Sequence, residues 1–116
     1  CPDTDFFVGL MDVHPDGSSI LVSEGLMRAR YRNGLEKQEL IEPETVYKIT
    51  IPMSHTGIEF KPGHRIRLSV TSSMFPRYGR NNNTGNPVNT DTETRIATNK
   101  VYHGAKHPSR LLLPIF

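Results

Sequence analysis

The chain has 116 residues, which is enough for one hydrophobic core and too few for two ordinary domains. Apolar residues make up 35% of it, and nine glycines and nine prolines favour a domain of strands and turns. A formal net charge of +2 gives no case for nucleic acid or a membrane as the main partner, and a single cysteine excludes an internal disulfide.

The N-terminal third predicts strands joined by tight turns. Residues 4–13 are rich in Phe and Val and predict a first strand, which ends at the turn signal Pro15-Asp16-Gly17. Residues 20–23 predict a second strand. Gly25 permits a bulge or kink before a further strand over residues 26–31.

The strand predicted over residues 26–31 carries an alternating row of arginines. Arg28, Arg30 and Arg32 share one parity, and Asn33-Gly34 follows as another turn. We interpret this arginine row as a solvated strand face, with contact to an acidic partner as the alternative.

The rest of the chain predicts further strands by alternation of apolar and polar residues. These are residues 46–51, 65–71, 96–103 and 110–115. Pro52 marks the end of the first as an edge or a bulge. In the second we expect Ile66, Leu68 and Val70 to point inward.

Six or more short strands, regular turns and almost no helical periodicity predict an all-β fold, a β-sandwich or jelly roll. The chain opens on Cys1 without an initiator Met, which favours a piece excised from a larger protein over a mature lipoprotein. We therefore expect one domain over residues 1–116.

No motif for catalysis or metal binding stands out. The chain has no Gly-x-Ser-x-Gly string, although scattered serines, histidines and aspartates leave a spatial triad open. His103 and His107 have the spacing of some zinc ligands, but Gly104 and Pro108 favour a turn there. Residues 89–93 alternate oxygen ligands without the Gly and Glu of a calcium loop. We expect no metal and no cofactor.

The long loop between the strands predicted at 65–71 and 96–103 gathers aromatic, basic and amide side chains. Because arginines and aromatics are enriched at interface anchors, we interpret the loop as a docking surface. Side-chain to backbone hydrogen bonds near Gly85 would close the loop on itself. The candidate docking residues are Phe75, Arg77, Tyr78, Arg80, Asn81, Asn83 and Thr84.

Several motifs occur together, in one order, along nearly the whole chain. They are Asp3-Thr4-Asp5-Phe6, Asp12-Val13-His14-Pro15-Asp16-Gly17, Phe60-Lys61-Pro62-Gly63-His64-Arg65-Ile66-Arg67-Leu68, Phe75-Pro76-Arg77, Arg80-Asn81, Asn83-Thr84-Gly85 and His107-Pro108-Ser109-Arg110-Leu111. With them the chain resembles the C-terminal domain of the cocaine esterase and X-prolyl dipeptidyl-peptidase family of serine hydrolases.

The resemblance implies a galactose-binding-domain-like jelly roll that packs on an α/β-hydrolase catalytic domain of the same polypeptide. The parent would hydrolyse esters, amides or X-prolyl peptides, and no position here matches its catalytic residues. The family's jelly roll begins about two strands earlier, so we expect an uncovered sheet edge, filled by an element outside this sequence or by self-association.

An alternative from a different class is a carbohydrate- or small-ligand-binding jelly roll, which the fold alone does not exclude. The absence of Trp and the small number of tyrosines weigh against a sugar-stacking surface. The sequence does not indicate where the protein resides.

Overall fold

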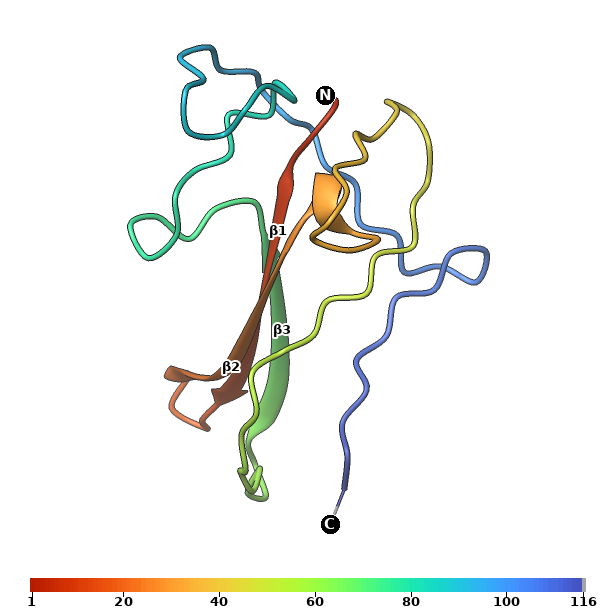
Figure 1. Ribbon diagram of the computed structural model, residues 1–116. Coiled ribbons are helices and arrows are strands. Elements are labelled where there is room, and N and C mark those ends of the chain that lie inside the picture. Colours follow the sequence, from red (N-terminus) through yellow and green to blue (C-terminus); the bar gives the residue numbers. More distant parts are fainter. Residues whose placement is uncertain (116) are drawn as a thin grey trace.

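The computed structural model describes residues 1–115 and is built around one three-stranded antiparallel sheet (Figure 1). The strands are β1 (Asp5–Val13), β2 (Ser19–Arg28) and β3 (Arg65–Thr71), and a short 3-10 helix, η1 (Ala29–Tyr31), follows β2 directly. Their order is β2-β1-β3, so β1 is central. The predicted all-β class is confirmed. The facing second sheet of a jelly roll is not formed by the described residues.

The β1–β2 hairpin turns where the sequence predicts a turn. Gly17 has a φ of 89°, and Asp16 Oδ1 accepts hydrogen bonds from the amide and the hydroxyl of Ser18. A register shift between Leu10 and Met11 marks a bulge in the pairing with β2. Within residues 1–115 there is no helix of the length and hydrophobicity that crossing a membrane requires.

The strands predicted over residues 20–23 and 26–31 form one strand, β2, which runs through Gly25 and ends at Arg28. The predicted strand is wrong over residues 29–31, which form η1, and the register shift lies opposite residues 21–23 and not at Gly25. The glycine serves a close approach instead: a Cβ at this position would lie 2.6 Å from the carbonyl oxygen of Pro52. Met53 forms an isolated antiparallel bridge with Gly25, and the Ser54 amide donates to the Glu24 carbonyl. Gly25 therefore lets the segment around Pro52 lie against the outer edge of β2.

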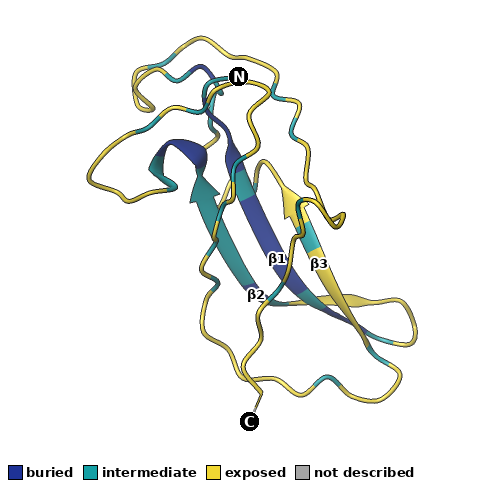
Figure 2. Cartoon of the chain, turned by 90° about the vertical axis from the view of Figure 1, so that its right-hand side faces the viewer, coloured by how far each residue is buried: buried dark blue, intermediate teal, exposed yellow. Residues whose placement is uncertain are grey.

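The core lies on β1 because this strand has a neighbour on each side. Figure 2 shows β1 almost entirely buried, β2 mostly intermediate and β3 mostly exposed. The buried apolar residues are Phe7, Val8, Leu10, Val13 and Ala29.

β3 forms where predicted, but its apolar face is not inward. Ile66, Leu68 and Val70 are 53%, 43% and 40% exposed. They pair with Asp12, Leu10 and Val8 of β1, so their common parity is correct. Their predicted burial is wrong because, within residues 1–115, no element covers this side of the edge strand.

The strands predicted at residues 46–51, 96–103 and 110–115 do not form, and these segments are irregular. A strand needs a partner for its backbone N–H and C=O groups, and the alternating pattern alone does not supply one. The predicted turn between His103 and Pro108 is confirmed by a hydrogen bond from the His107 amide to the Gly104 carbonyl.

Candidate functional site

The loop over residues 74–87 has an outward part and an inward part. Phe75 is 61% exposed, and the Arg80 guanidinium lies 4.9 Å from the centre of its ring. The exposed side chain of Arg77 places Nη2 2.5 Å from Glu24 Oε1 of β2. We name Phe75, Arg77 and Arg80 the aromatic-arginine surface. Phe75 and Arg80 project from the loop and remain available for contact, whereas Arg77, although exposed, is paired with Glu24.

Tyr78 joins this surface to the core. Its ring lies 5.4 Å, centroid to centroid, from the ring of buried Phe7 in β1. The Arg77 guanidinium lies 5.8 Å from the Tyr78 ring centre. Tyr78 thus acts as an anchor for the loop, because an aromatic pair adds stability beyond the area that it buries.

Asn81 points inward and connects the loop to the start of β1. Its Nδ2 donates to Asp3 Oδ2 at 2.8 Å and to Asp5 Oδ1 at 2.7 Å. Both aspartates are buried. One amide group therefore satisfies oxygens of two buried carboxylates, which gives Asn81 a structural role in this chain.

The two carboxylates are also paired with two arginines. Arg28 donates two hydrogen bonds to the Asp5 carboxylate, at 2.8 and 2.9 Å, and these are the main cause of the raised pKa of Arg28. Arg30, which is 1% exposed, donates from Nε to Asp3 Oδ2 at 2.7 Å and from Nη1 to the Asn86 carbonyl at 3.0 Å.

The interpretation of the arginine row as a solvated face is wrong. Arg28 and Arg30 face buried aspartates, and Arg32 lies 4.6 Å from the Tyr47 ring centre while donating to the Ala29 carbonyl. A sequence signal existed: Asp3 and Asp5 alternate like Arg28 and Arg30. Opposite charges on neighbouring antiparallel strands pair when the register brings them together.

The predicted closure of the loop on itself is confirmed. The Asn83 amide donates to Asn81 Oδ1, and Asn83 adopts a φ of 61°. The hydroxyl of Thr84, a buried residue, donates to Asp91, and this hydrogen bond holds the pKa of the Asp91 carboxyl below its usual range. Asn83 Nδ2 donates to the Arg95 carbonyl. Asn83 and Thr84 thus fix the shape of the loop.

In the segment over residues 89–93, which resembles a calcium loop in its alternating oxygen ligands, the Asp91 carboxylate is used within the chain. Asp91 accepts hydrogen bonds from Thr84, from the Asn86 side chain and from the Glu93 amide. Within residues 1–115, the side-chain hydrogen bonds of histidine rings run to Asp12, and none runs to a serine hydroxyl.

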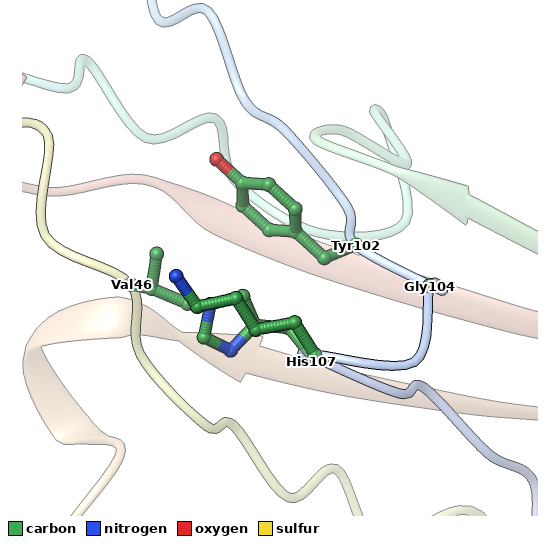
Figure 3. A pocket seen from close by; sticks show the side chains of 5 residues that line it. Val46, Tyr102, Gly104 and His107 are labelled. Atoms are coloured by element: carbon green, nitrogen blue, oxygen red, sulfur yellow. The ribbon is translucent and has the colours of Figure 1, made fainter.

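Two hollows on the surface have the size of ligand sites. Figure 3 shows the smaller one, of about 390 Å³, where Val46 faces the turn that carries Tyr102 and His107. The larger is an open groove of about 650 Å³ whose lining includes Leu26, Tyr31 and Tyr78. Neither lining contains a serine or a carboxylate, so neither has the groups of a hydrolytic site.

Comparison with known proteins places these features in one family. Residues 1–112 match the X-Pro dipeptidyl-peptidase C-terminal non-catalytic domain. The chain is 44% identical over 115 residues to cocaine esterase from Rhodococcus sp. strain MB1 Bresler, a match that covers 97% of this chain and 20% of that protein. The chain therefore spans about a fifth of the length of this relative.

Solved structures give the same result. The chain is similar to an aminopeptidase from a marine sediment archaeon, Thaumarchaeota archaeon, with a TM-score of 0.68 and 35% identity over 72% of this chain and 15% of that one. It is also similar to an alpha-amino acid ester hydrolase, with a TM-score of 0.59 and 32% identity over the same two shares. The resemblance found in the sequence motifs is confirmed.

Proposed function

The chain belongs to the family of X-Pro dipeptidyl-peptidase C-terminal non-catalytic domains, and from this premise we propose that it braces the α/β-hydrolase catalytic domain of a longer serine hydrolase. It packs on that domain and leaves the chemistry to it. The parent enzyme acts on esters, amides or X-prolyl peptides.

The aromatic-arginine surface is the observation that carries this proposal. Its base is held rigidly, because Tyr78 packs on Phe7 and Asn81 bonds two buried carboxylates. Its tip presents Phe75 and Arg80 stacked on each other and mostly free of contacts within the chain. A rigid loop with an exposed aromatic-arginine pair has the composition of an interface anchor and loses little entropy on docking.

We expect Arg80→Ala and Arg77→Ala, each made in the full-length protein, to lower its melting temperature. The physical reason is the loss of interdomain contacts, where an anchor residue contributes about 2 kcal/mol. Arg77→Ala also removes the ion pair with Glu24 within the chain, so Arg80→Ala is the more direct test of docking. The ratio of kcat/KM between two substrates should stay unchanged, since neither side chain takes part in the reaction. Calorimetry and steady-state kinetics on the same preparations measure both quantities.

Lys37→Ala is the matched control, because the Lys37 side chain is 82% exposed and its ion pair with Glu39 lies on the surface. This variant should have the same melting temperature as the wild type. An unchanged melting temperature in both arginine variants would contradict the proposal that the loop docks on the catalytic domain. Altered substrate preference at an unchanged melting temperature would instead favour a role in substrate binding.

The uncovered face of β3 supports a second contact with the rest of the parent protein. Ile66, Leu68 and Val70 form an exposed apolar face on β3. β3 is also an edge strand of the three-stranded sheet, and the backbone groups of such an edge pair with further strands. We expect the isolated chain to self-associate through this edge and Leu68→Lys to reduce the association. Sedimentation equilibrium measures it, and a monomeric wild-type chain at high concentration would contradict the expectation.

The small-ligand alternative has one supporting observation. The groove that includes Tyr31 and Tyr78 has a volume within the range of ligand pockets. Its open shape and its position beside the docking loop fit an interdomain contact better than an enclosed ligand.

A further inference from the structure

A cluster of two histidines and one aspartate lies at the end of the β1–β3 ladder. Asp12 and His14 are two residues apart on or just beyond β1, so they share one face of the strand. Val13 pairs with Arg65, and continuing this register by one residue sets His14 opposite His64. We propose that Asp12, His14 and His64 form a binding site for one divalent cation of the zinc type.

The distances within the cluster fit a single ion. His64 Nδ1 lies 2.9 and 3.0 Å from the two Asp12 carboxylate oxygens, and His14 Nε2 lies 3.5 Å from Asp12 Oδ2. One ligand atom from each of the three residues falls within 4.8 Å of the others. A tetrahedral zinc ion bound at ordinary lengths separates its ligand atoms by about 3.4 Å, so small side-chain adjustments complete the site.

Burial around the cluster suits a site that is held on one side and open on the other. Asp12 is buried and the side chain of His64 is 13% exposed, whereas the side chain of His14 is 40% exposed. The buried carboxylate and His64 are positioned by the sheet, and His14 closes over them with its ring centre 4.4 Å from that of His64. Solvent reaches this side, which leaves room for a water as the fourth ligand.

The ligand types select the class of cation. Two imidazoles and a carboxylate suit zinc and its neighbours in the first transition row, whereas calcium and magnesium prefer oxygen ligands throughout. The ion would join the start of the β1–β2 turn to the start of β3. Coordination of the ion by His64 Nδ1 would replace the present contact between this nitrogen and the Asp12 carboxylate.

The test uses the full-length protein, stripped of metal with EDTA and then titrated with Co²⁺ and with Zn²⁺. We expect the protein to bind one Co²⁺ per chain and to show the visible absorption spectrum of tetrahedral Co²⁺. Adding Zn²⁺ should displace the Co²⁺ and abolish this spectrum. His14→Ala should weaken Zn²⁺ binding on the order of 100-fold or more, because even residues outside the coordination sphere cost 10–100-fold. The His14 side chain is 40% exposed and lies just beyond β1, so we expect this variant to retain the fold.

His107→Ala is the matched control, since this half-exposed histidine packs on Tyr102 and belongs to no such cluster. It should bind Zn²⁺ like the wild type. His64→Ala should lose binding as His14→Ala does. Zinc affinity that is equal in the wild type and in both cluster variants would overturn the proposal, and so would a stripped protein that binds no Co²⁺. The docking proposal is independent of either result.

Discussion

Arg30→Ala will lower the free energy of unfolding by about 3–5 kcal/mol, the cost of breaking a buried ion pair by removing one partner. Arg30 is 1% exposed, and Asp3, which accepts its Nε–H and its backbone amide, is fully buried. The substitution leaves the Asp3 carboxylate without its cation in a place that water does not reach.

Arg30 also ties three parts of the chain together. It follows β2, contacts Asp3 ahead of β1, and donates to the Asn86 carbonyl in the long loop. Arg30→Lys keeps the charge but cannot reproduce the planar set of donors. We therefore expect its free energy of unfolding to lie between those of Arg30→Ala and the wild type. Hydrogen exchange of β1 peptides in the full-length protein reports the free energy of opening for this domain alone.

Lys37→Ala serves here too as the surface control. It should change the free energy of opening, measured by hydrogen exchange of β1, by less than about 1 kcal/mol. Equal protection of β1 in Arg30→Ala and in the wild type would show that the pair contributes nothing. If the β1 amides are as weakly protected from hydrogen exchange in Arg30→Lys as in Arg30→Ala, the whole effect is due to the geometry of the donors.

The sequence predicted two of the three strands, β1 and β3, closely. β1 and β3 lie within one residue of their expected bounds, and the turns at Gly17 and Gly34 take the positive φ that these signals require. Alternation reports which side chains share a face, and that part holds for β3. Alternation does not report what covers the face, so it predicts Ile66, Leu68 and Val70 to point inward although they are exposed.

The same limit explains the errors in the candidate site. The arginine row was predicted on one strand, but β2 ends at Arg28 and residues 29–31 form η1. The partners of Arg28 and Arg30 lie more than twenty residues away and are identified only by the register of β1 against β2. The composition of the loop over residues 74–87 identified it as a candidate docking surface. Which of its side chains anchor the loop and which point outward depends on where β1 begins. Register is set by long-range pairing, which a single sequence does not state.

The second large effect is expected for Asn81→Asp, which keeps the shape of the side chain and replaces two N–H donors by a carboxyl oxygen. Asn81 Nδ2 lies within 2.8 Å of an oxygen of Asp3 and of an oxygen of Asp5. Like charges about 4 Å apart repel by about 4 kcal/mol at the effective dielectric of a protein. We therefore expect a loss of about 4 kcal/mol at pH 7, against about 1.5–3 kcal/mol for Asn81→Ala, which only deletes hydrogen bonds to charged groups.

The two variants should also differ in their pH dependence. Neighbouring carboxylates raise the folded-state pKa of the introduced carboxyl above its unfolded value of about 3.9. The folded state then binds more protons than the unfolded state, so the stability of Asn81→Asp, relative to the wild type at the same pH, falls as the pH rises from about 4. The deficit of Asn81→Ala relative to the wild type carries no such slope.

Asn33→Asp is a matched control, because Asn33 Nδ2 also donates to a carboxylate, Glu39 Oε2, at 2.7 Å, but both side chains lie toward solvent. Screening by water should keep its effect below about 1 kcal/mol. Hydrogen exchange of β1 and of the loop over residues 74–87, measured at pH 5 and pH 7, separates the three variants. If Asn81→Asp and Asn33→Asp lose the same stability at both pH values, the buried carboxylates do not depend on the loop, and the aromatic-arginine surface is not anchored through Asn81.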